Sequence, residues 1–315
     1  MQIRNYFDYR ASLALAWLLA LPVVGMAQHP IFENVNSAAA AAGHHNVKLA
    51  VMEWITASDE AGQTVFFNDR GNKQFVEHWV PNDPRNDIGL DLGTALAWGI
   101  DGVEVTDDVL PAEDLMAIGR GMQTWQDQDC SYIPLVDLGV SDFDYGFVQY
   151  LVGTSAEPPT DFGGTDFFFP FLTHAGFLGG AFFDEVACGS DPEDPGCGAG
   201  ILGITFTFVW IDGPPTDIDG NGKFDTAFRE IYYNDDYAWG DGTGGTIDIE
   251  TVALHEAGHG LSQAHFGKLA RTDRNGKFHF APRAVMNAGY TGIQRSLGKT
   301  DNGGHCSIWG SWPSN

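Results

Sequence analysis

The spacing of apolar residues predicts strands and helices in a definite order along the chain. The strongest strand signal runs from 201 to 211, where large apolar residues alternate with smaller ones: Leu202, Ile204, Phe206, Phe208 and Trp210. A helix that begins at Pro111 is predicted by apolar residues three and four positions apart: Leu115, Ile118, Met122 and Trp125. Together these patterns indicate an α+β domain.

Other segments carry weaker signals of the same kind. Further strands are predicted at 94–100, 133–138, 145–152 and 228–233. We expect a β-rich unit at 48–80, an aromatic and glycine-rich loop at 162–183, and a flexible, alanine-rich leader at 28–46. Asp248 is a suitable N-cap for a helix from Ile249 to about Leu261.

The beginning of the chain has the features of a secretory signal. Arg4 and Arg10 lead into an apolar run of about 15 residues, shorter than the roughly 20 that cross a bilayer, and cleavage is expected after Ala27. We therefore predict a signal peptide at 1–27, a leader or propeptide-like segment at 28–87 and a main domain at 88–315. The proline- and aspartate-rich stretch at 81–87 marks that boundary. No later stretch is long and apolar enough for a membrane anchor, so we expect a secreted protein.

A histidine motif in the predicted helix carries the chemistry. His255 and His259 are four residues apart, so both imidazoles project from one helix face and can bind one metal ion. If the chain turns sharply after Leu261, His265 becomes a third ligand and one coordination position stays open, as in catalytic zinc sites. Glu256 lies beside the ligands, where a carboxylate can act as general base for hydrolysis.

The stretch from 255 to 265 resembles the zinc-binding motif of metzincin proteases, His-Glu-x-x-His-x-x-Gly-x-x-His. Ser262 stands where metzincins have glycine, and because the backbone must turn there with positive φ, serine would adopt that conformation at a cost of about 1 kcal/mol. The resemblance, closest to bacterial matrixin-like peptidases, implies that 88–315 is a catalytic domain with a twisted mixed sheet over the active-site helix. It also implies that Met286 forms the floor under the metal and that Tyr290 lines the neighbouring pocket.

A second candidate metal site precedes the strand at 228–233. Oxygen-bearing side chains alternate around Gly222 in the manner of a calcium loop: Asp217, Asp219, Asn221 and Asp225. The twelfth loop position is Phe228 where an EF-hand has glutamate, so the pattern is incomplete. We expect a structural Ca²⁺ here, and an ordinary turn built from aspartate, glycine and asparagine is the alternative.

The amino-acid composition argues against some classes of binding partner. With 43% hydrophobic residues, the chain of 315 residues can bury a sizeable core. A formal net charge of −26 argues against nucleic acid or an anionic membrane as a partner, and it favours calcium binding. A solvated acidic surface accounts for most of these carboxylates.

The four cysteines fit an oxidising compartment. Cys188 and Cys197 bracket a short acidic loop that a local disulfide would close, and Cys130 and Cys306 would then form a long-range bridge. Three pairings are possible, and this is the one we predict. Zinc binding by cysteine is the weaker interpretation because no Cys-x-x-Cys occurs.

The sequence thus predicts a secreted, monomeric zinc endopeptidase that acts on protein or peptide substrates, with Zn²⁺ as catalytic and Ca²⁺ as structural ion. A secreted calcium-stabilised binding or adhesion module with a vestigial zinc site is one alternative. A zinc hydrolase acting on a non-peptide substrate is another. An open cleft beside Tyr290 would favour peptide recognition, whereas a filled site would favour the binding module.

Overall fold

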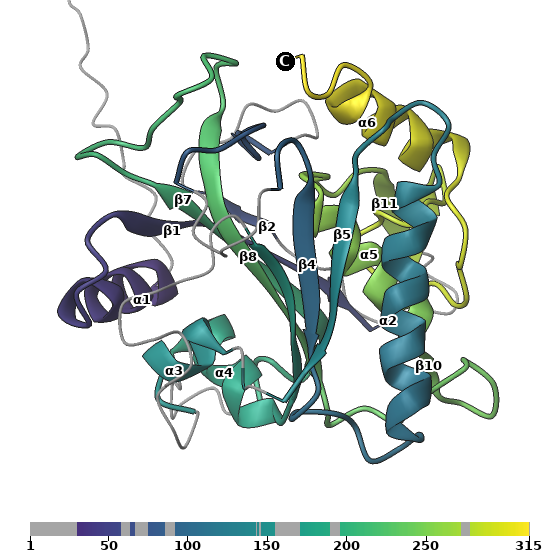
Figure 1. Ribbon diagram of the computed structural model, residues 1–315. Helices are drawn as coiled ribbons and strands as arrows, with labels where there is room; N and C mark the ends of the chain where they lie inside the picture. The colour runs from purple at the N-terminus through teal and green to yellow at the C-terminus, as the bar shows by residue number, and fades with distance from the viewer. Residues whose placement is uncertain are drawn as a thin grey trace, which may run out of the picture.

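The computed structural model describes residues 30–57, 64–66, 75–85, 92–142, 144, 146–154, 171–189, 196–271 and 278–314. The predicted signal peptide at 1–27 lies outside these residues. The structure combines a large mixed sheet with helices on both faces (Figure 1). This confirms the α+β class predicted from the spacing of apolar residues.

The large sheet has the strand order β2-β1-β7-β8-β6-β4-β5, and β3 pairs with β8. Its strands are β1 (Val47–Thr56), β2 (Thr64–Phe66), β3 (Glu77–His78), β4 (Leu96–Asp101), β5 (Leu135–Ser141), β6 (Phe171–Leu178), β7 (Ile201–Trp210) and β8 (Phe224–Asn234). β5, β4, β6 and β8 run parallel to one another. β7 is antiparallel to β8, and β1 is antiparallel to both β7 and β2.

Two smaller sheets lie apart from this one. β9 (Trp239–Gly240) pairs with β10 (Ile247–Asp248), and β11 (Lys268–Arg271) pairs with β12 (Phe278–Ala281).

Helices cover the two faces of the large sheet in two groups of three (Figure 1). α1 (Pro30–Ala41), α3 (Phe147–Leu151) and α4 (Gly180–Cys188) pack through large apolar side chains against one face. α2 (Pro111–Gln126), α5 (Ile249–Gly260) and α6 (Lys299–Trp309) pack against the other. His255, Glu256 and His259 lie on α5, so the predicted zinc site is on this face of the sheet.

β7 shows how the sequence separates these two faces. Ile204, Phe206 and Phe208 point into the apolar cluster with α1 and α4, as the alternation predicts. Their small neighbours face α5 and leave space for its side chains. At Gly203 an added Cβ would lie 3.0 Å from the Cγ of Glu256. A larger residue there would push α5 away from the sheet.

Several predicted elements need correction. The leader at 28–46 contains helix α1, whose Ile31, Phe32 and Val35 are buried. The strand expected at 145–152 is the short helix α3, because its apolar residues pack under the sheet face as a single turn. The loop expected at 162–183 contains strand β6 and the start of α4 within the described residues. Tertiary packing overrides local propensity in α3. The alanine-rich α1 instead follows its helix propensity.

The N-terminal segment is part of the sheet. β1 pairs with β7 from Val47 to Thr56, and Leu49, Met52 and Trp54 pack on the same face as α1. The described strands of the β-rich unit predicted at 48–80, β1, β2 and β3, are therefore joined to the main sheet by backbone hydrogen bonds.

Both predicted disulfides are present. Cys130 and Cys306 have Cα atoms 5.5 Å apart and tie the end of α2 to α6. Cys188 and Cys197 have Cα atoms 6.6 Å apart and close the acidic loop after α4. In the described part of the chain, no helix is long and apolar enough to cross a membrane.

Candidate metal centre

Helix α5 carries the site and is fixed at its N-terminus. Asp248 is the N-cap, and its carboxylate accepts a hydrogen bond of 3.0 Å from the backbone N–H of Thr251. Arg295 forms an ion pair with Asp248 at 2.5 Å. Every residue of α5 is buried, so the helix runs through the interior and presents polar side chains there. This confirms the helix and the cap predicted from the sequence.

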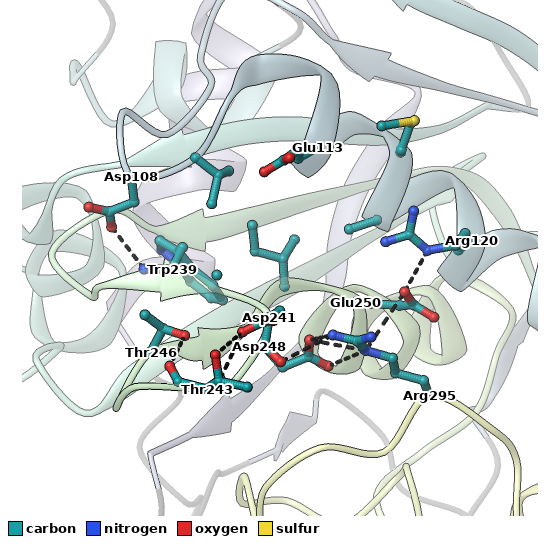
Figure 2. Close-up of a pocket in the computed structure, with 15 residues that line it drawn as sticks. Asp108, Glu113, Arg120, Trp239, Asp241, Thr243, Thr246, Asp248, Glu250 and Arg295 are labelled. Carbon is teal, nitrogen blue, oxygen red and sulfur yellow. Dashed lines mark hydrogen bonds and ion pairs between the residues drawn. The ribbon is translucent and has the colours of Figure 1, made fainter.

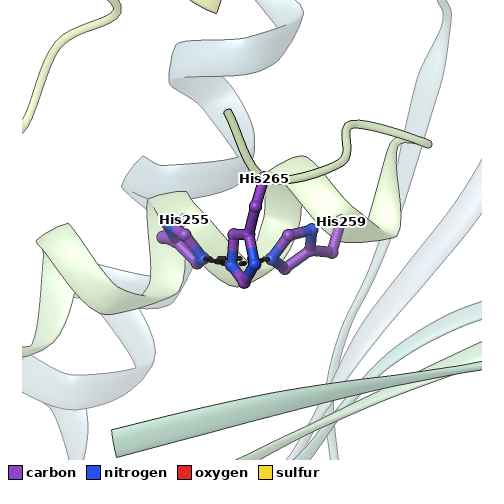
Figure 3. A group of neighbouring side chains, drawn as sticks. All are labelled: His255, His259 and His265. Carbon is purple, nitrogen blue, oxygen red and sulfur yellow. Dashed lines mark hydrogen bonds between the residues drawn. The ribbon is translucent and has the colours of Figure 1, made fainter. Parts of the chain in front are cut away.

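The three motif histidines converge on one point (Figure 3). The Nε2 atoms of His255 and His259 are 3.0 Å apart, and each lies 3.1 Å from Nε2 of His265. A tetrahedral zinc ion with Zn–N bonds of about 2.0–2.1 Å separates its nitrogen ligands by roughly 3.3 Å. The arrangement therefore fits a metal ion after a small expansion.

The tautomers of two histidines support a cation at this point. Nδ1 of His255 lies 2.6 Å from the carbonyl oxygen of Val285, and Nδ1 of His259 lies 2.7 Å from that of Gln263. A carbonyl can only accept, so both Nδ1 atoms carry the proton and both Nε2 atoms present lone pairs. Burial lowers the pKa of all three imidazoles, that of His259 to about 3, so they are neutral near pH 7. Neutral acceptors at this separation repel each other unless a cation lies between them.

A left-handed residue brings His265 into the cluster. Ser262 has φ of 67°, the positive value expected at the position of the motif glycine. The turn is closed by hydrogen bonds from Ser262 N to His259 O (2.9 Å) and from Gln263 N to Gly258 O (2.9 Å). The Ser262 hydroxyl lies 3.2 Å from Nδ1 of His78. Serine thus makes the turn that the motif requires.

Met286 lies beneath the helix, as predicted. It is fully buried, and a Cβ added to Gly258 would lie 2.3 Å from its sulfur, so the thioether packs directly on the helix backbone between His255 and His259. Asp301 holds this turn because its two carboxylate oxygens accept the N–H groups of Val285 and Met286, each at 3.1 Å. The same turn supplies the Val285 carbonyl that orients His255.

Glu256 points from α5 toward the sheet. The Thr205 hydroxyl donates to Oε2 at 2.6 Å, and the Ile55 backbone N–H donates to Oε1 at 3.4 Å. Burial raises the pKa of this carboxyl well above its ordinary value. A divalent cation beside it would act in the opposite direction and favour the carboxylate form.

Tyr290 lies at the N-terminal end of α5. It is nearly buried, and its hydroxyl accepts a 3.2 Å hydrogen bond from the Asp248 backbone N–H. A cavity of about 600 Å³ opens at this end of the helix (Figure 2). Arg120, Glu250 and Arg295 line it and form ion pairs, whereas the three histidines do not reach it. This cavity is separate from the metal-binding cluster.

The predicted calcium loop brings its three aspartates together. Carboxylate oxygens of Asp217, Asp219 and Asp225 lie within 4.8 Å of one another and could hold a cation. Asn221 lies beside them: its Nδ2 donates to Asp219 at 3.0 Å, and its Oδ1 accepts from Lys223 N at 2.7 Å. Asp225 also accepts hydrogen bonds from Arg85 and Thr216, at 3.1 and 2.6 Å.

A further acidic group was not predicted. Asp101, Glu104 and Asp144 place carboxylate oxygens within 4.8 Å of one another. Gln149 donates to Glu104 at 2.9 Å. Burial, together with the charges of Asp144 and Asp101, raises the pKa of Glu104 to about 8. Asp101 and Glu104 are close in sequence, but Asp144 comes from a separate segment, so no local motif predicts the group.

Sequence reasoning also missed the residues that hold the end of α5. The guanidinium of Arg229 on β8 donates to the carbonyls of His259 and Gly260 and is fully buried. Trp79 and Trp309 donate through their indole N–H groups to the carbonyls of Gly260 and Leu261, at 3.0 and 2.9 Å. These donors satisfy the free carbonyls of the helix end. The carbonyls lie in the turn that carries His265, so their partners fix its geometry.

β1 lies over part of the metal centre, and His265 is half-buried. His255, His259 and Glu256 are fully buried, and β1 runs along β7 beside them. Glu53 of β1 places Oε2 2.5 Å from Nδ1 of His259. This is the filled site that the sequence analysis associated with a binding module.

No protein-family model matches this chain, and a search of curated proteins finds no significant match. Chemically, the arrangement offers three neutral nitrogen ligands and a neighbouring carboxylate, beside strand β7, which pairs with β8 on one side and β1 on the other.

Proposed function

We propose that this protein is a secreted zinc-dependent endopeptidase with a metzincin-type catalytic domain. The observation that carries the proposal is the convergence of the Nε2 atoms of His255, His259 and His265, brought about by a positive-φ turn at Ser262. Three imidazoles with one open position are typical of catalytic zinc, whereas structural zinc usually has four protein ligands. The Cys130–Cys306 and Cys188–Cys197 disulfides fit an exported protein.

The residues have separate roles in the proposed hydrolysis. Zn²⁺ held by the three histidines would lower the pKa of a water molecule and polarise the scissile carbonyl. Glu256 accepts the proton of the attacking water and passes it to the leaving amine. Thr205 orients the Glu256 carboxylate through its 2.6 Å hydrogen bond. The carbonyls of Val285 and Gln263 keep His255 and His259 in the tautomer that offers Nε2.

The strand β7 provides the binding edge for a peptide. Its Thr205 hydrogen-bonds to Glu256, and the strand already pairs with an extended chain, β1. Backbone hydrogen bonds to such an edge would hold a protein substrate in extended form across the metal centre. Unfolded proteins are therefore the substrates to test first.

A second candidate function is favoured by one observation. The covered centre agrees with a binding module in which the metal is structural and β1 is permanent. In that case Glu256 has no proton to transfer, and chains with and without its carboxylate behave alike toward substrates.

The deciding experiment uses the purified protein from residue 28 onward, unfolded casein as substrate and measured zinc content. We expect cleavage by wild type, loss of cleavage in Glu256→Ala, and about one zinc per chain in both. The matched variant Glu250→Gln, which changes a carboxylate on the same helix away from the histidines, should retain cleavage. Full zinc occupancy without cleavage by any form, including one that has lost β1, would overturn the endopeptidase proposal.

A further inference from the structure

β1 lies in a groove formed by two backbone edges. On one side it is antiparallel to β7, with Glu53 opposite Thr205 and Ile55 opposite Gly203. On the other side its last residue pairs with the segment after Met286: Thr56 N donates to Ala288 O at 3.3 Å, and Tyr290 N donates to Thr56 O at 2.8 Å. An extended peptide that crossed the metal centre would need the same donors and acceptors. β1 therefore occupies the position of a substrate chain.

The strand also places charge and backbone against the catalytic groups. Glu53 is fully buried, and its Oε2 lies 2.5 Å from Nδ1 of His259. Its charge also acts on His265 and on Glu256. Ile55 N donates to Oε1 of Glu256 at 3.4 Å. Two residues of one strand thus contact a metal ligand and the proposed base.

A bound cation would hold this carboxylate in place. Glu53 and Glu256 are like charges in one buried region, which costs free energy unless a cation is close. Arg229 supplies one positive charge near Glu53, and it is already hydrogen-bonded to the end of α5. A divalent ion between the histidines would attract both carboxylates at once. Binding of the ion and docking of β1 should therefore stabilise each other.

We propose that β1 is an internal inhibitory strand, that Glu53 ties it to the metal centre, and that the strand must be removed or displaced before a substrate can bind. The inference rests on the proposed function for its catalytic part. Its structural part, the link between the metal and β1, stands independently of any activity. The other face of β1 packs through Leu49, Met52 and Trp54 against the α1 side of the sheet, so α1 and β1 should leave together.

The first test measures hydrogen exchange of the 47–56 amides with and without zinc, in Glu256→Gln so that no cleavage interferes. We expect zinc to slow exchange in this segment, and Glu53→Gln on the same background to reduce that effect and weaken zinc affinity about ten- to a hundred-fold. Lys48→Gln, which removes a charge from the other end of the same strand, should respond to zinc like its parent. Unchanged exchange when one zinc is bound per chain would overturn the link.

The second test measures access to the centre. A fluorescent peptide hydroxamate, which binds zinc through two oxygens, should bind the intact chain weakly and bind Glu53→Gln at least about tenfold more tightly. On casein, wild type should show a lag that ends when an N-terminal fragment containing Glu53 is released. Full activity of a chain that keeps β1, or equal hydroxamate affinity before and after its loss, would overturn the inhibitory role. If zinc slows exchange in β1 and cleaved chains bind hydroxamate but never cleave casein, the inference stands and the endopeptidase proposal fails.

Discussion

The two faces of β7 show how one strand serves two purposes. Toward α1 and α4 it presents Ile204, Phe206 and Phe208, which pack with other aromatic rings and contain no polar side-chain atoms. Toward α5 it presents Gly203 and Thr205, which leave space for Glu256 and hydrogen-bond to it. The first face gains stability from burial. The face toward α5 makes fewer apolar contacts and leaves space for ionisable groups.

Burying charged groups on the α5 side of the sheet costs free energy. Around the end of α5, Glu53, Glu77 and Arg229 are all buried, and the charges of Arg229 and Glu53 act in opposite directions on the pKa of Glu77. Such groups persist only when they are paired or needed. Stability and chemistry are therefore separable in this fold. A substitution on the α1 side should change stability and leave metal binding intact, and a substitution on the α5 side should do the reverse.

Phe206→Ala should have the largest effect on stability. Phe206 is fully buried and packs on Phe182 and Tyr232, so truncation should lower the free energy of unfolding by about 3–5 kcal/mol. Zinc affinity should stay within about twofold because the side chain faces away from α5. Denaturant unfolding and zinc titration measure the two quantities. A parallel loss of zinc affinity in the folded variant would show that the two faces are coupled.

Removal of the metal should have the next largest effect. With free zinc at a hundred times its Kd, the ion should add about 2.7 kcal/mol to stability, and a chelator should abolish this gain. His259→Ala should lose both the gain and the response to chelation, since it removes a ligand and the hydrogen bond to Gln263. Thermal unfolding with zinc and with chelator measures both. An equal response of wild type and variant would show that the histidines do not bind the ion.

The parts of the centre that the sequence predicted are the local ones. His255, His259 and His265 lie within one helix and one turn, and the positive φ at Ser262 follows from the motif. Glu53 and Arg229 could not be found in this way. Ile55 contacts Glu256 across 201 residues, and no spacing rule connects such positions. Only the assembled sheet brings them together.

Elements with a strong apolar pattern were predicted correctly from the sequence. Elements whose type depends on tertiary packing were not. The alternation in β7 and the three- and four-residue spacing in α2 identified both elements correctly. The strand predicted at 145–152 is wrong: Val148 and Tyr150 favour strands, yet the five residues of α3 pack under the sheet as one helical turn. In α1, Ile31, Phe32, Val35 and Ala39 have helical spacing, a signal that the alanine-rich composition concealed.

Ser262→Gly tests the turn on the metal side. Glycine adopts a φ of 67° without the steric cost that serine bears, so the folded state should be stabilised by about 1 kcal/mol. Part of this gain is offset because glycine raises the conformational entropy of the unfolded chain. The contact with His78 at 3.2 Å would be lost. We expect a small net gain in the free energy of unfolding and unchanged zinc affinity, measured by denaturant unfolding and zinc titration. A large loss of stability would show that the hydroxyl contact matters more than the backbone strain.

Glu104→Gln should have the smallest effect, and only at high pH. Burial raises the pKa of Glu104 to about 8 from an ordinary value of 4.5, so the folded protein favours the protonated form. Its contribution to stability is complete below pH 4.5 and is lost as the pH rises through about 8. Glutamine resembles the protonated acid at every pH.

The Tm of Glu104→Gln should therefore equal that of wild type at pH 4 and exceed it by about 2–4 °C at pH 8.5 without calcium. Glu113→Gln, an exposed carboxylate at the start of α2, is the matched control and should show no such difference. Calcium should reverse the order at pH 8.5 if Asp101, Glu104 and Asp144 hold the cation, because the carboxylate is then the favoured form. A Tm difference that is constant from pH 4 to pH 8.5 would mean that Glu104 titrates in the folded protein as it does in the unfolded chain. In that case the acidic group would be open to solvent, and the polar chemistry of the sheet would be confined to the face of α5.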